Sequence, residues 1–224
     1  MADVSASQHG GTWALVPLKS SEQAKSRLAS ALDAQQRSRL FFAMAGHVIR
    51  TLRACDEIQG VAVATSSQQV AAFAAAAGAL TVMQPADLGM SFALSSALDT
   101  LQSVKPSRVL MLPGDLPLAT VASLQQLLAA PQPGIAIVPD RQRIGTNALL
   151  CSPPQIIAPT FGGRSFERHL HAATAAGMTA NIVELPELAL DVDEPEDLAL
   201  LQQHPAATAL QALSHSDPDF APAR

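Results

Sequence analysis

Short apolar runs alternate with longer segments rich in Ala, Leu and Gln along most of this 224-residue chain. The runs have the length of buried strands, and the longer segments carry apolar residues three and four positions apart, which is the spacing of one helix face. This alternation is typical of βαβ units around a mostly parallel sheet. The sequence therefore predicts a single α/β domain, Rossmann-like, with a mostly parallel twisted sheet and helices on both faces.

The pattern places seven strands and five helices on the chain. The strands are expected at Trp13–Leu18, Val61–Thr65, Leu80–Met83, Arg108–Leu112, Ile135–Pro139, Ala148–Cys151 and Asn181–Leu185. The covering helices are expected at Ala34–Ala54, Gln68–Ala77, Phe92–Ser103, Val121–Ala130 and Phe166–Ala176. Residues 12–203 then form the domain, between a flexible tail at residues 1–11 and a mobile tail at residues 204–224, where no period is sustained.

The charge balance argues against two classes of partner. With 14 Lys and Arg against 19 Asp and Glu, the formal net charge is -5, which is unfavourable for a general binder of nucleic acid or anionic membrane. The chain shows no basic-then-apolar leader and no apolar run of membrane-spanning length. These features predict a cytoplasmic protein. Cys55 and Cys151 match no metal spacing and are expected to be buried free thiols.

A carboxylate follows one of the buried strands. The apolar residues 109–112 end at Asp115, which stands between Pro113 and Pro117 in the sequence VLMLPGDLPL. An ionised carboxylate at the edge of a core costs free energy unless a partner compensates it. A divalent cation is one candidate partner, and the alternative is that Asp115 is simply a turn residue.

Two further carboxylates stand in the sequence LDVDEPEDL, near the end of the domain. Asp191 comes after an apparent strand end, and Asp193 follows two residues later. With Asp115, they could supply the few carboxylate oxygens that Mg²⁺ prefers. Asp193 is also well placed as a helix N-cap, with Glu196 three residues on, and one residue could serve both purposes.

Three cations follow the first predicted strand: Lys19, Lys25 and Arg27. Gathered in one loop, they could bind the negative charge of a triphosphate. The alternative is that they are ordinary solvated surface residues. A P-loop is excluded, because the chain contains no G-x-x-x-x-G-K-[ST] run.

The sequence FGGRSFERHL, residues 161–170, predicts a pocket for an acid or a phosphate. Gly162 and Gly163 let the backbone approach a ligand, and Ser165 opens a helix whose unpaired N–H groups favour an anion. A Gly-rich turn with Ser165 as N-cap is the alternative, and His169 and His171 are assigned no role. Ligands of parallel sheets bind beyond the carboxyl ends of the strands, so this stretch and the GTN motif at residues 145–147 should share one crevice with the carboxylates and cations.

The ordered motifs VPLK, AKSRL, LPGDLP, GTNALL, FGGRSFERH and LDVDEPEDL resemble the 2-phospho-L-lactate guanylyltransferase family. The resemblance runs from Trp13 to Leu201. It implies a nucleotidyltransferase fold and the transfer of GMP from GTP to a small phosphorylated three-carbon acid, with release of pyrophosphate. The product of that family is the activated precursor of the deazaflavin coenzyme F-420, which is passed to a downstream transferase. The resemblance also allows a homodimer.

The resemblance assigns roles to the motif residues. It implies that Mg²⁺ is the cofactor and that the catalytic residues are Asp115 and Lys25. The metal ligands would be Asp115, Asp191 and Asp193; the triphosphate contacts Lys19, Lys25 and Arg27; and the acid contacts Thr146, Gly162 and Ser165.

The chain departs from the family pattern at two places. It has Gly89, Met90 and Ser91 where the family usually reads G-L-N, and Arg143 and Ile144 where an acidic D-G precedes the GTN motif. Met90, Ser91 and Ile144 are therefore predicted as walls of the acid pocket. The acid is 3-phosphoglycerate, 2-phospholactate or phosphoenolpyruvate, and the shorter Ser91 favours 3-phosphoglycerate by leaving room.

Two other functions remain open on the residues alone. The D-x-D triplet at residues 191–193 is also typical of metal-dependent glycosyltransferases that use a nucleotide-sugar. The same fold could also serve as a non-catalytic nucleotide-binding module, because fold does not fix function.

Overall fold

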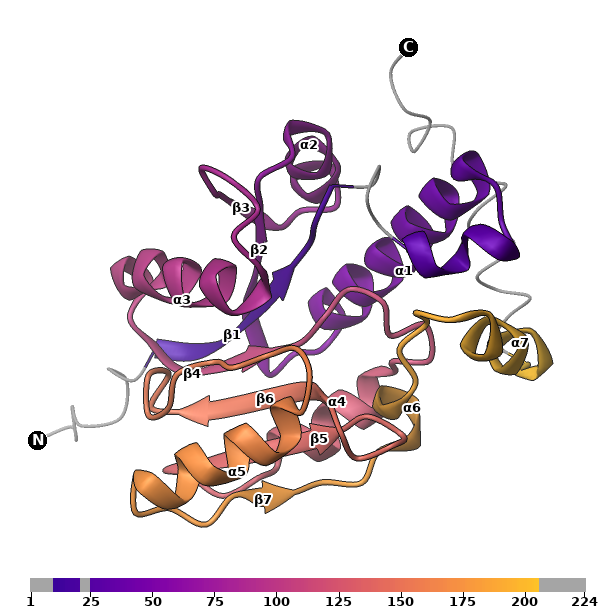
Figure 1. Cartoon of the computed structure of the whole chain (residues 1–224). Helices are drawn as coiled ribbons and strands as arrows, with labels where there is room; N and C mark the ends of the chain where they lie inside the picture. The colour runs from indigo at the N-terminus through magenta and orange to yellow at the C-terminus, as the bar shows by residue number, and fades with distance from the viewer. Residues whose placement is uncertain (1–9, 21–24, 206–224) are drawn as a thin grey trace, which may run out of the picture.

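The apolar runs of the sequence form one sheet in the computed structural model, which describes residues 10–20 and 25–205 (Figure 1). Within these residues the sheet has seven strands in the order β3-β2-β1-β4-β6-β5-β7. Their bounds are β1 (Gly10–Pro17), β2 (Ile58–Thr65), β3 (Leu80–Met83), β4 (Pro106–Met111), β5 (Gly134–Pro139), β6 (Thr146–Ser152) and β7 (Asn181–Ile182). Residues 1–9 and 206–224, which make up most of the two predicted tails, lie outside the described residues.

Helices cover both faces of the sheet, as predicted. They are α1 (Ala34–Arg53), α2 (Gln68–Ala76), α3 (Met90–Leu101), α4 (Val121–Leu128), α5 (Ser165–Ala175), α6 (Pro186–Ala189) and α7 (Pro195–Gln203), with 3-10 turns η1 (Ser26–Ser30) and η2 (Gln102–Val104). One core cluster contains buried residues of α1, α2 and α4, such as Phe42, and a second contains those of α3 and α5, such as Leu94. The five predicted helices are all present, with ends that differ by a few residues.

One strand runs against the others, and this places the GTN motif. β6 pairs antiparallel with both β4 and β5, whereas the other pairs in the sheet are parallel. An antiparallel strand begins at the edge where its parallel neighbours end. Thr146, the first residue of β6, is therefore paired with Pro139, the last residue of β5, at the carboxyl edge.

The segment before Asp191 differs from the prediction. β7 ends at Ile182 instead of Leu185, and the segment ahead of Asp191 contains the short helix α6, so Asp191 does not follow a strand. The N-cap of α7 is Glu194, with Asp197 completing the capping box, which makes the prediction of Asp193 as the cap wrong by one residue. The reason is Pro195, which prefers the first helical position and so fixes the cap at the residue before it.

Ser165 is not a helix cap either. Arg164 occupies the N-cap position of α5 with a left-handed backbone, and no side chain caps the helix there. Ser165 is instead the first helical residue, and its hydroxyl is free for a contact to another element. No helix in the described part of the chain combines the length and the apolar character needed to cross a membrane. Cys55 and Cys151 are buried and free, as predicted.

Candidate active site

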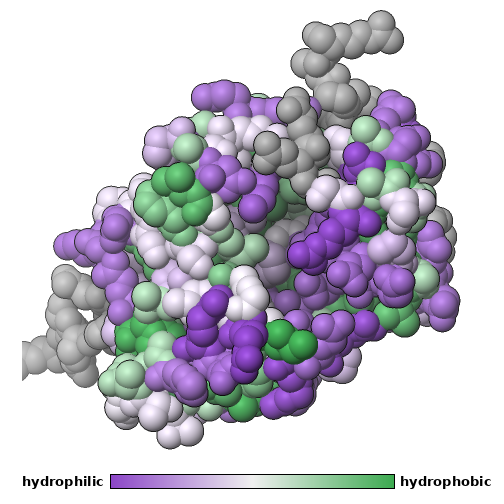
Figure 2. Space-filling model, viewed as in Figure 1, coloured by the Kyte–Doolittle hydropathy of each residue, from purple (hydrophilic) through white to green (hydrophobic). Residues whose placement is uncertain are grey.

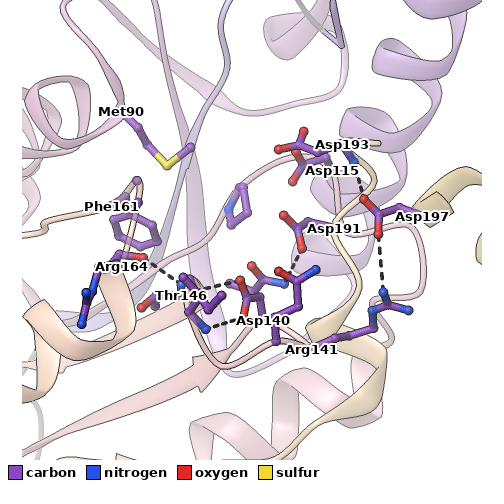
Figure 3. A pocket seen from close by; sticks show the side chains of 18 of the residues that line it. Met90, Asp115, Asp140, Arg141, Thr146, Phe161, Arg164, Asp191, Asp193 and Asp197 are labelled. Carbon is purple, nitrogen blue, oxygen red and sulfur yellow. Dashed lines mark hydrogen bonds and ion pairs between the residues drawn. The ribbon is translucent and has the colours of Figure 1, made fainter. Parts of the chain in front are cut away.

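A hollow of about 360 Å³ opens at the carboxyl edge of the sheet (Figure 3). It lies between the loops that follow β4 and β5, the start of α5 and the segment that leads into α7. On the face shown in Figure 2, hydrophilic side chains gather beside it. The predicted site residues that line it are Arg27, Met90, Asp115, Ile144, Thr146, Gly162, Ser165, Asp191 and Asp193.

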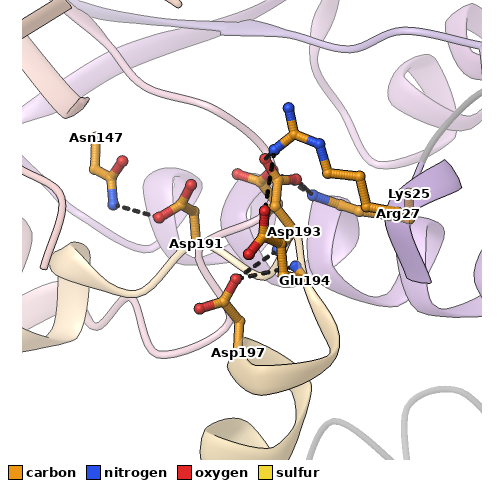
Figure 4. Close-up of polar contacts among 8 residues, drawn as sticks. Lys25, Arg27, Asn147, Asp191, Asp193, Glu194 and Asp197 are labelled. Carbon is orange, nitrogen blue, oxygen red and sulfur yellow. Dashed lines mark hydrogen bonds and ion pairs between the residues drawn. The ribbon is translucent and has the colours of Figure 1, made fainter. Parts of the chain in front are cut away.

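The partner of Asp115 in this structure is Lys25, which Figure 4 shows beside Asp193. The Lys25 ammonium donates to Asp115 Oδ2 at 2.5 Å and to Asp193 Oδ1 at 2.8 Å, and its side chain is only 6% exposed. Burial alone would lower the pKa of Lys25, but the charges of Asp115 and Asp193 raise it above its ordinary value. Lys25 therefore stays protonated and neutralises carboxylates from two separate loops.

The three predicted metal ligands line one hollow without forming a ready metal site. Within residues 10–20 and 25–205, no group of three His, Cys, Asp or Glu residues is arranged to hold a metal ion. Asp115 Oδ1 is nevertheless buried and has no hydrogen-bond partner among these residues. Burial, and then the charge of Asp115, raises the pKa of Asp191 to about 6, although Asn147 donates to its carboxylate at 3.3 Å. Both observations describe carboxylates that a further cation would stabilise.

Two of the three cations of the first loop, Lys25 and Arg27, meet at Asp193, and the third lies apart. Lys19 lies 3.6 Å from Asp87 Oδ2 and lines a second hollow, whereas Lys25 is held between the carboxylates. Arg27 lines the main hollow, is largely exposed, and pairs loosely with Asp193 at 3.9 Å. The predicted triphosphate contacts are therefore divided between two places, with Lys25 and Arg27 beside Asp193 and Lys19 beside Asp87.

The wall opposite Asp115 includes two neutral hydroxyl residues, Thr146 and Ser165. Ser165 Oγ accepts the backbone N–H of Thr146 at 2.9 Å, which joins α5 to the first residue of β6. The N–H groups of Ser165 and Phe166 already donate to the carbonyls of Gly162 and Ile144. These first N–H groups of α5 are therefore not free for an anion, contrary to the sequence prediction.

Sequence reasoning missed two carboxylates that shape the site. Asp140 accepts the N–H groups of Ile144 and Gly145 at 2.9 and 2.7 Å, and a Cβ at Gly145 would lie 2.7 Å from Asp140 Oδ2, so a larger residue there would displace this carboxylate. Asp197 Oδ2 accepts the N–H of Asp193, and Oδ1 lies 3.6 Å from Arg141. The acidic D-E-P-E-D run at residues 193–197 indicates a helix cap near Asp197. The sequence predicts this cap at Asp193, one residue before the observed N-cap Glu194.

The second hollow lies between the ends of β1, β2 and β3 and the start of α3. Gln84 lines it, and this residue is only 5% exposed. Neither the nitrogen nor the oxygen of its side-chain amide has a hydrogen-bond partner among the described residues. Met90 lines both hollows. Ser91, predicted as a wall of the acid pocket, lines neither; its hydroxyl donates to the Phe161 carbonyl at 3.1 Å.

Comparisons with known proteins agree on one family. The family model described as "Guanylyl transferase CofC like" matches residues 12–213. A phosphoenolpyruvate guanylyltransferase of Conexibacter woesei is 37% identical over 195 residues, covering 86% of this chain and 87% of the relative. One of Sphaerobacter thermophilus is 35% identical over 194 residues, covering 86% and 93%. A solved structure from Desulfovibrio desulfuricans G20, named as a nucleotide-diphospho-sugar transferase, superposes with a TM-score of 0.72 at 15% identity, over 92% of this chain and 97% of the other, and shows the shared fold.

Proposed function

The chain belongs to the CofC-like guanylyl transferase family, and we propose that the guanylyl group of GTP is transferred by it to the phosphate of a small phosphorylated three-carbon acid. Phosphoenolpyruvate, which names both relatives above, is the first acid to test, beside 3-phosphoglycerate and 2-phospholactate. The product would be the activated precursor in coenzyme F-420 biosynthesis, formed in the cytoplasm and passed to a downstream transferase.

The observation that carries this proposal is the pair of unlike walls around the main hollow. On one side, Arg27 and the carboxylates, with the buried Lys25 behind them, form a charged wall suited to a triphosphate and a cation. On the other side, Thr146 and Ser165 form a hydroxyl wall, whose O–H groups suit the anions of a small acid. A reaction that joins two phosphates needs two such subsites side by side.

The chemistry requires no protein nucleophile. A phosphate oxygen of the acid attacks the α-phosphorus of GTP, the new P–O bond forms, the bond from the α-phosphorus to the bridging oxygen breaks, and pyrophosphate leaves. Lys25 and Arg27 would stabilise the negative charge of the triphosphate, while the hydroxyl wall holds the acid in line. Catalysis then consists of positioning and electrostatic stabilisation.

A divalent cation, which we take to be Mg²⁺, would be held by Asp115 and Asp191, with Asp193 beside them. The unpartnered Asp115 Oδ1 and the raised pKa of Asp191 fit such an ion, because both indicate uncompensated negative charge. When bound, it would supply charge neutralisation on the phosphates. Lys25 already neutralises part of the same cluster, so it would balance the carboxylates before the ion binds.

The second hollow is proposed as the place of the guanine base. The Gln84 amide offers one donor and one acceptor, which together match the O6 and N1–H edge of guanine. Lys19 lines the same hollow. Its ammonium would contact the phosphates of a GTP whose base occupies this hollow.

The proposed function is tested by incubating the protein with GTP, Mg²⁺ and each of the three acids, and by mass spectrometry of the nucleotide product. A guanylylated acid with equimolar pyrophosphate is expected with at least one of them. The rival glycosyltransferase function, suggested by the D-x-D triplet, is tested in parallel with GDP-sugars. Consumption of a GDP-sugar with no pyrophosphate release from GTP would overturn the proposal.

A further inference from the structure

We propose that His169 is a positioning residue that makes the hydroxyl of Thr146 a hydrogen-bond donor toward the acid substrate. The inference rests on the proposed function, since it concerns the acid subsite. His169 lies on α5, is completely buried, and touches the hollow only through Thr146 and the loop before the helix. The sequence alone gave it no role.

The proton on the His169 ring is fixed by its two partners. Nε2 lies 2.9 Å from the backbone nitrogen of Thr160, whose N–H can only donate, so Nε2 carries no proton and accepts. Nδ1 lies 2.9 Å from Thr146 Oγ1. A neutral imidazole has one N–H, so the N–H is on Nδ1 and donates to the Thr146 hydroxyl.

This contact decides what the Thr146 hydroxyl can do. Its oxygen accepts from His169, so its own proton is left for another acceptor, and no second partner of this hydroxyl is found among the described residues. Ser165 is held in the same way, because its oxygen accepts the Thr146 N–H. Both residues line the main hollow, so this wall presents two hydroxyl donors to an anion.

The surrounding groups make this arrangement necessary. The N–H groups of Ser165 and Phe166 are occupied by carbonyls, so the hydroxyls take over the task expected of the helix N-terminus. Burial, and then the charge of Arg168, lowers the pKa of His169 to about 4, so the ring stays neutral at physiological pH and keeps the single tautomer. The edge of the His169 ring also packs against Phe161, with ring centroids 5.1 Å apart, which holds its orientation.

Two substitutions of the same residue separate this role from simple packing. In His169→Asn the side-chain amide stands where Nδ1 was, so it can still donate to Thr146 but cannot reach the Thr160 N–H. In His169→Gln the amide extends to the position of Nε2, so it can accept from Thr160 but no longer supports Thr146. Both leave space in the core, and His171→Gln, an exposed position on the same helix, is the control.

The measurement is steady-state kinetics with GTP and phosphoenolpyruvate or 3-phosphoglycerate, whichever the wild type uses, together with thermal unfolding of each variant. His169→Gln is expected to raise KM for the acid about tenfold with little change in KM for GTP, because a hydrogen bond to a charged group is weakened. His169→Asn should keep KM for the acid within about threefold of wild type, and His171→Gln should match wild type. Equal increases in the Asn and Gln variants, or equal increases for both substrates, would overturn the proposal.

A double-mutant cycle with Thr146→Val tests whether His169 acts through the hydroxyl. Once the hydroxyl is absent, His169→Gln should have little further effect on KM for the acid. If it raises KM as much in the Val background as in wild type, His169 acts by another route and the inference fails. Thr146→Val alone tests the underlying acid subsite: if it leaves KM for every acid unchanged, the proposed subsite fails and the inference fails with it. Thr146→Ser, which keeps the hydroxyl, should restore most of the affinity, and it offers a second test if a His169 variant does not fold.

Discussion

The charged wall and the hydroxyl wall of the hollow are stabilised in opposite ways. Lys25 binds carboxylates that come from loops far away in the sequence, and these carboxylates remain partly exposed. Thr146, Ser165 and His169 are buried and joined by neutral hydrogen bonds between one strand and one helix. In the charged wall the exposed Arg27 is only loosely paired, whereas the hydroxyl wall is preformed.

This difference has a physical reason and a functional consequence. The pair of Arg27 with Asp193 reaches solvent and is weakened by screening, so a phosphate can replace Asp193 as the partner of Arg27 at small cost. Buried neutral hydrogen bonds cannot be exchanged without leaving a polar group unsatisfied. Nucleotide and cation binding should therefore rearrange the charged wall, while the acid enters a wall that is already in place.

The largest effect is expected at Asp115. Asp115→Asn removes a charge from the wall that meets the reacting phosphates, so turnover should fall about 10²-fold or more. The fold should persist, because the residue lies at the rim of the sheet; circular dichroism and thermal unfolding check this. Asp99→Asn, on the outer part of α3, is the matched control. Near-normal pyrophosphate release by the Asp115 variant would contradict a charged catalytic wall.

The two cations of this wall should differ in their importance. Lys25→Met removes the buried partner of Asp115 and Asp193, and should lower both stability and turnover, the latter by roughly 10-fold or more. Arg27→Ala removes an exposed and loosely paired cation, so a smaller rise in KM for GTP is expected. Steady-state kinetics with both substrates provides the measurement. An effect confined to KM for the acid would mean that the nucleotide and acid subsites have been exchanged.

His169, which donates to Thr146 of the hydroxyl wall, should affect the pH dependence of the free energy of unfolding. The pKa of His169 is about 4 in the folded protein and about 6.5 in the unfolded chain. Between these values the unfolded chain binds a proton that the folded one does not, so stability falls as pH drops, by at most about 1.4 kcal/mol per pH unit. Urea unfolding at pH 7 and pH 5 should show a steeper loss for wild type than for His169→Asn. Comparing the two proteins cancels the opposite contribution of Asp191, whose pKa is raised.

The second hollow provides a test that touches neither wall. Gln84→Leu removes the amide proposed to meet guanine, so KM for GTP should rise about tenfold with KM for the acid unchanged. The same variant should use ATP and GTP with more similar efficiency than wild type does. If GTP kinetics are unaffected, the base lies elsewhere and the main hollow must hold more of the nucleotide.

The smallest effect is expected from the residues that differ from the family pattern. The double substitution Met90→Leu with Ser91→Asn should shift preference from 3-phosphoglycerate toward 2-phospholactate or phosphoenolpyruvate. Because Ser91 does not line the hollow, the change in discrimination between the acids should be about 1 kcal/mol, the lower end for a pocket-wall change. Direct competition among the three acids measures it. If wild type ignores 3-phosphoglycerate in this mixture, the substrate prediction fails while guanylyl transfer stands.

The sequence alone was sufficient for the elements of the fold and for the edge where the site lies. Strand and helix periods are local, so the seven strands and five of the helices were predicted within a few residues of their observed bounds. The position of the site at the carboxyl edge follows from a general rule for parallel sheets. As expected from this rule, one hollow is lined by Asp115, Thr146, Ser165 and Asp191. The local errors were small: the cap at Glu194 was missed by one residue, and the end of β7 by three.

Only the tertiary structure decided which side chains meet. The contacts of Lys25 join residues 90 and 168 positions apart, and no local pattern specifies such a pairing. The antiparallel direction of β6 decides that Thr146 meets Ser165 and His169, so the roles of these three residues depend on how β6 and α5 pack together. The local sequence determines which side chains are buried at regular intervals. The hydrogen-bond partner of a buried polar group is determined instead by how distant strands and helices pack together, because every buried polar group must be hydrogen-bonded.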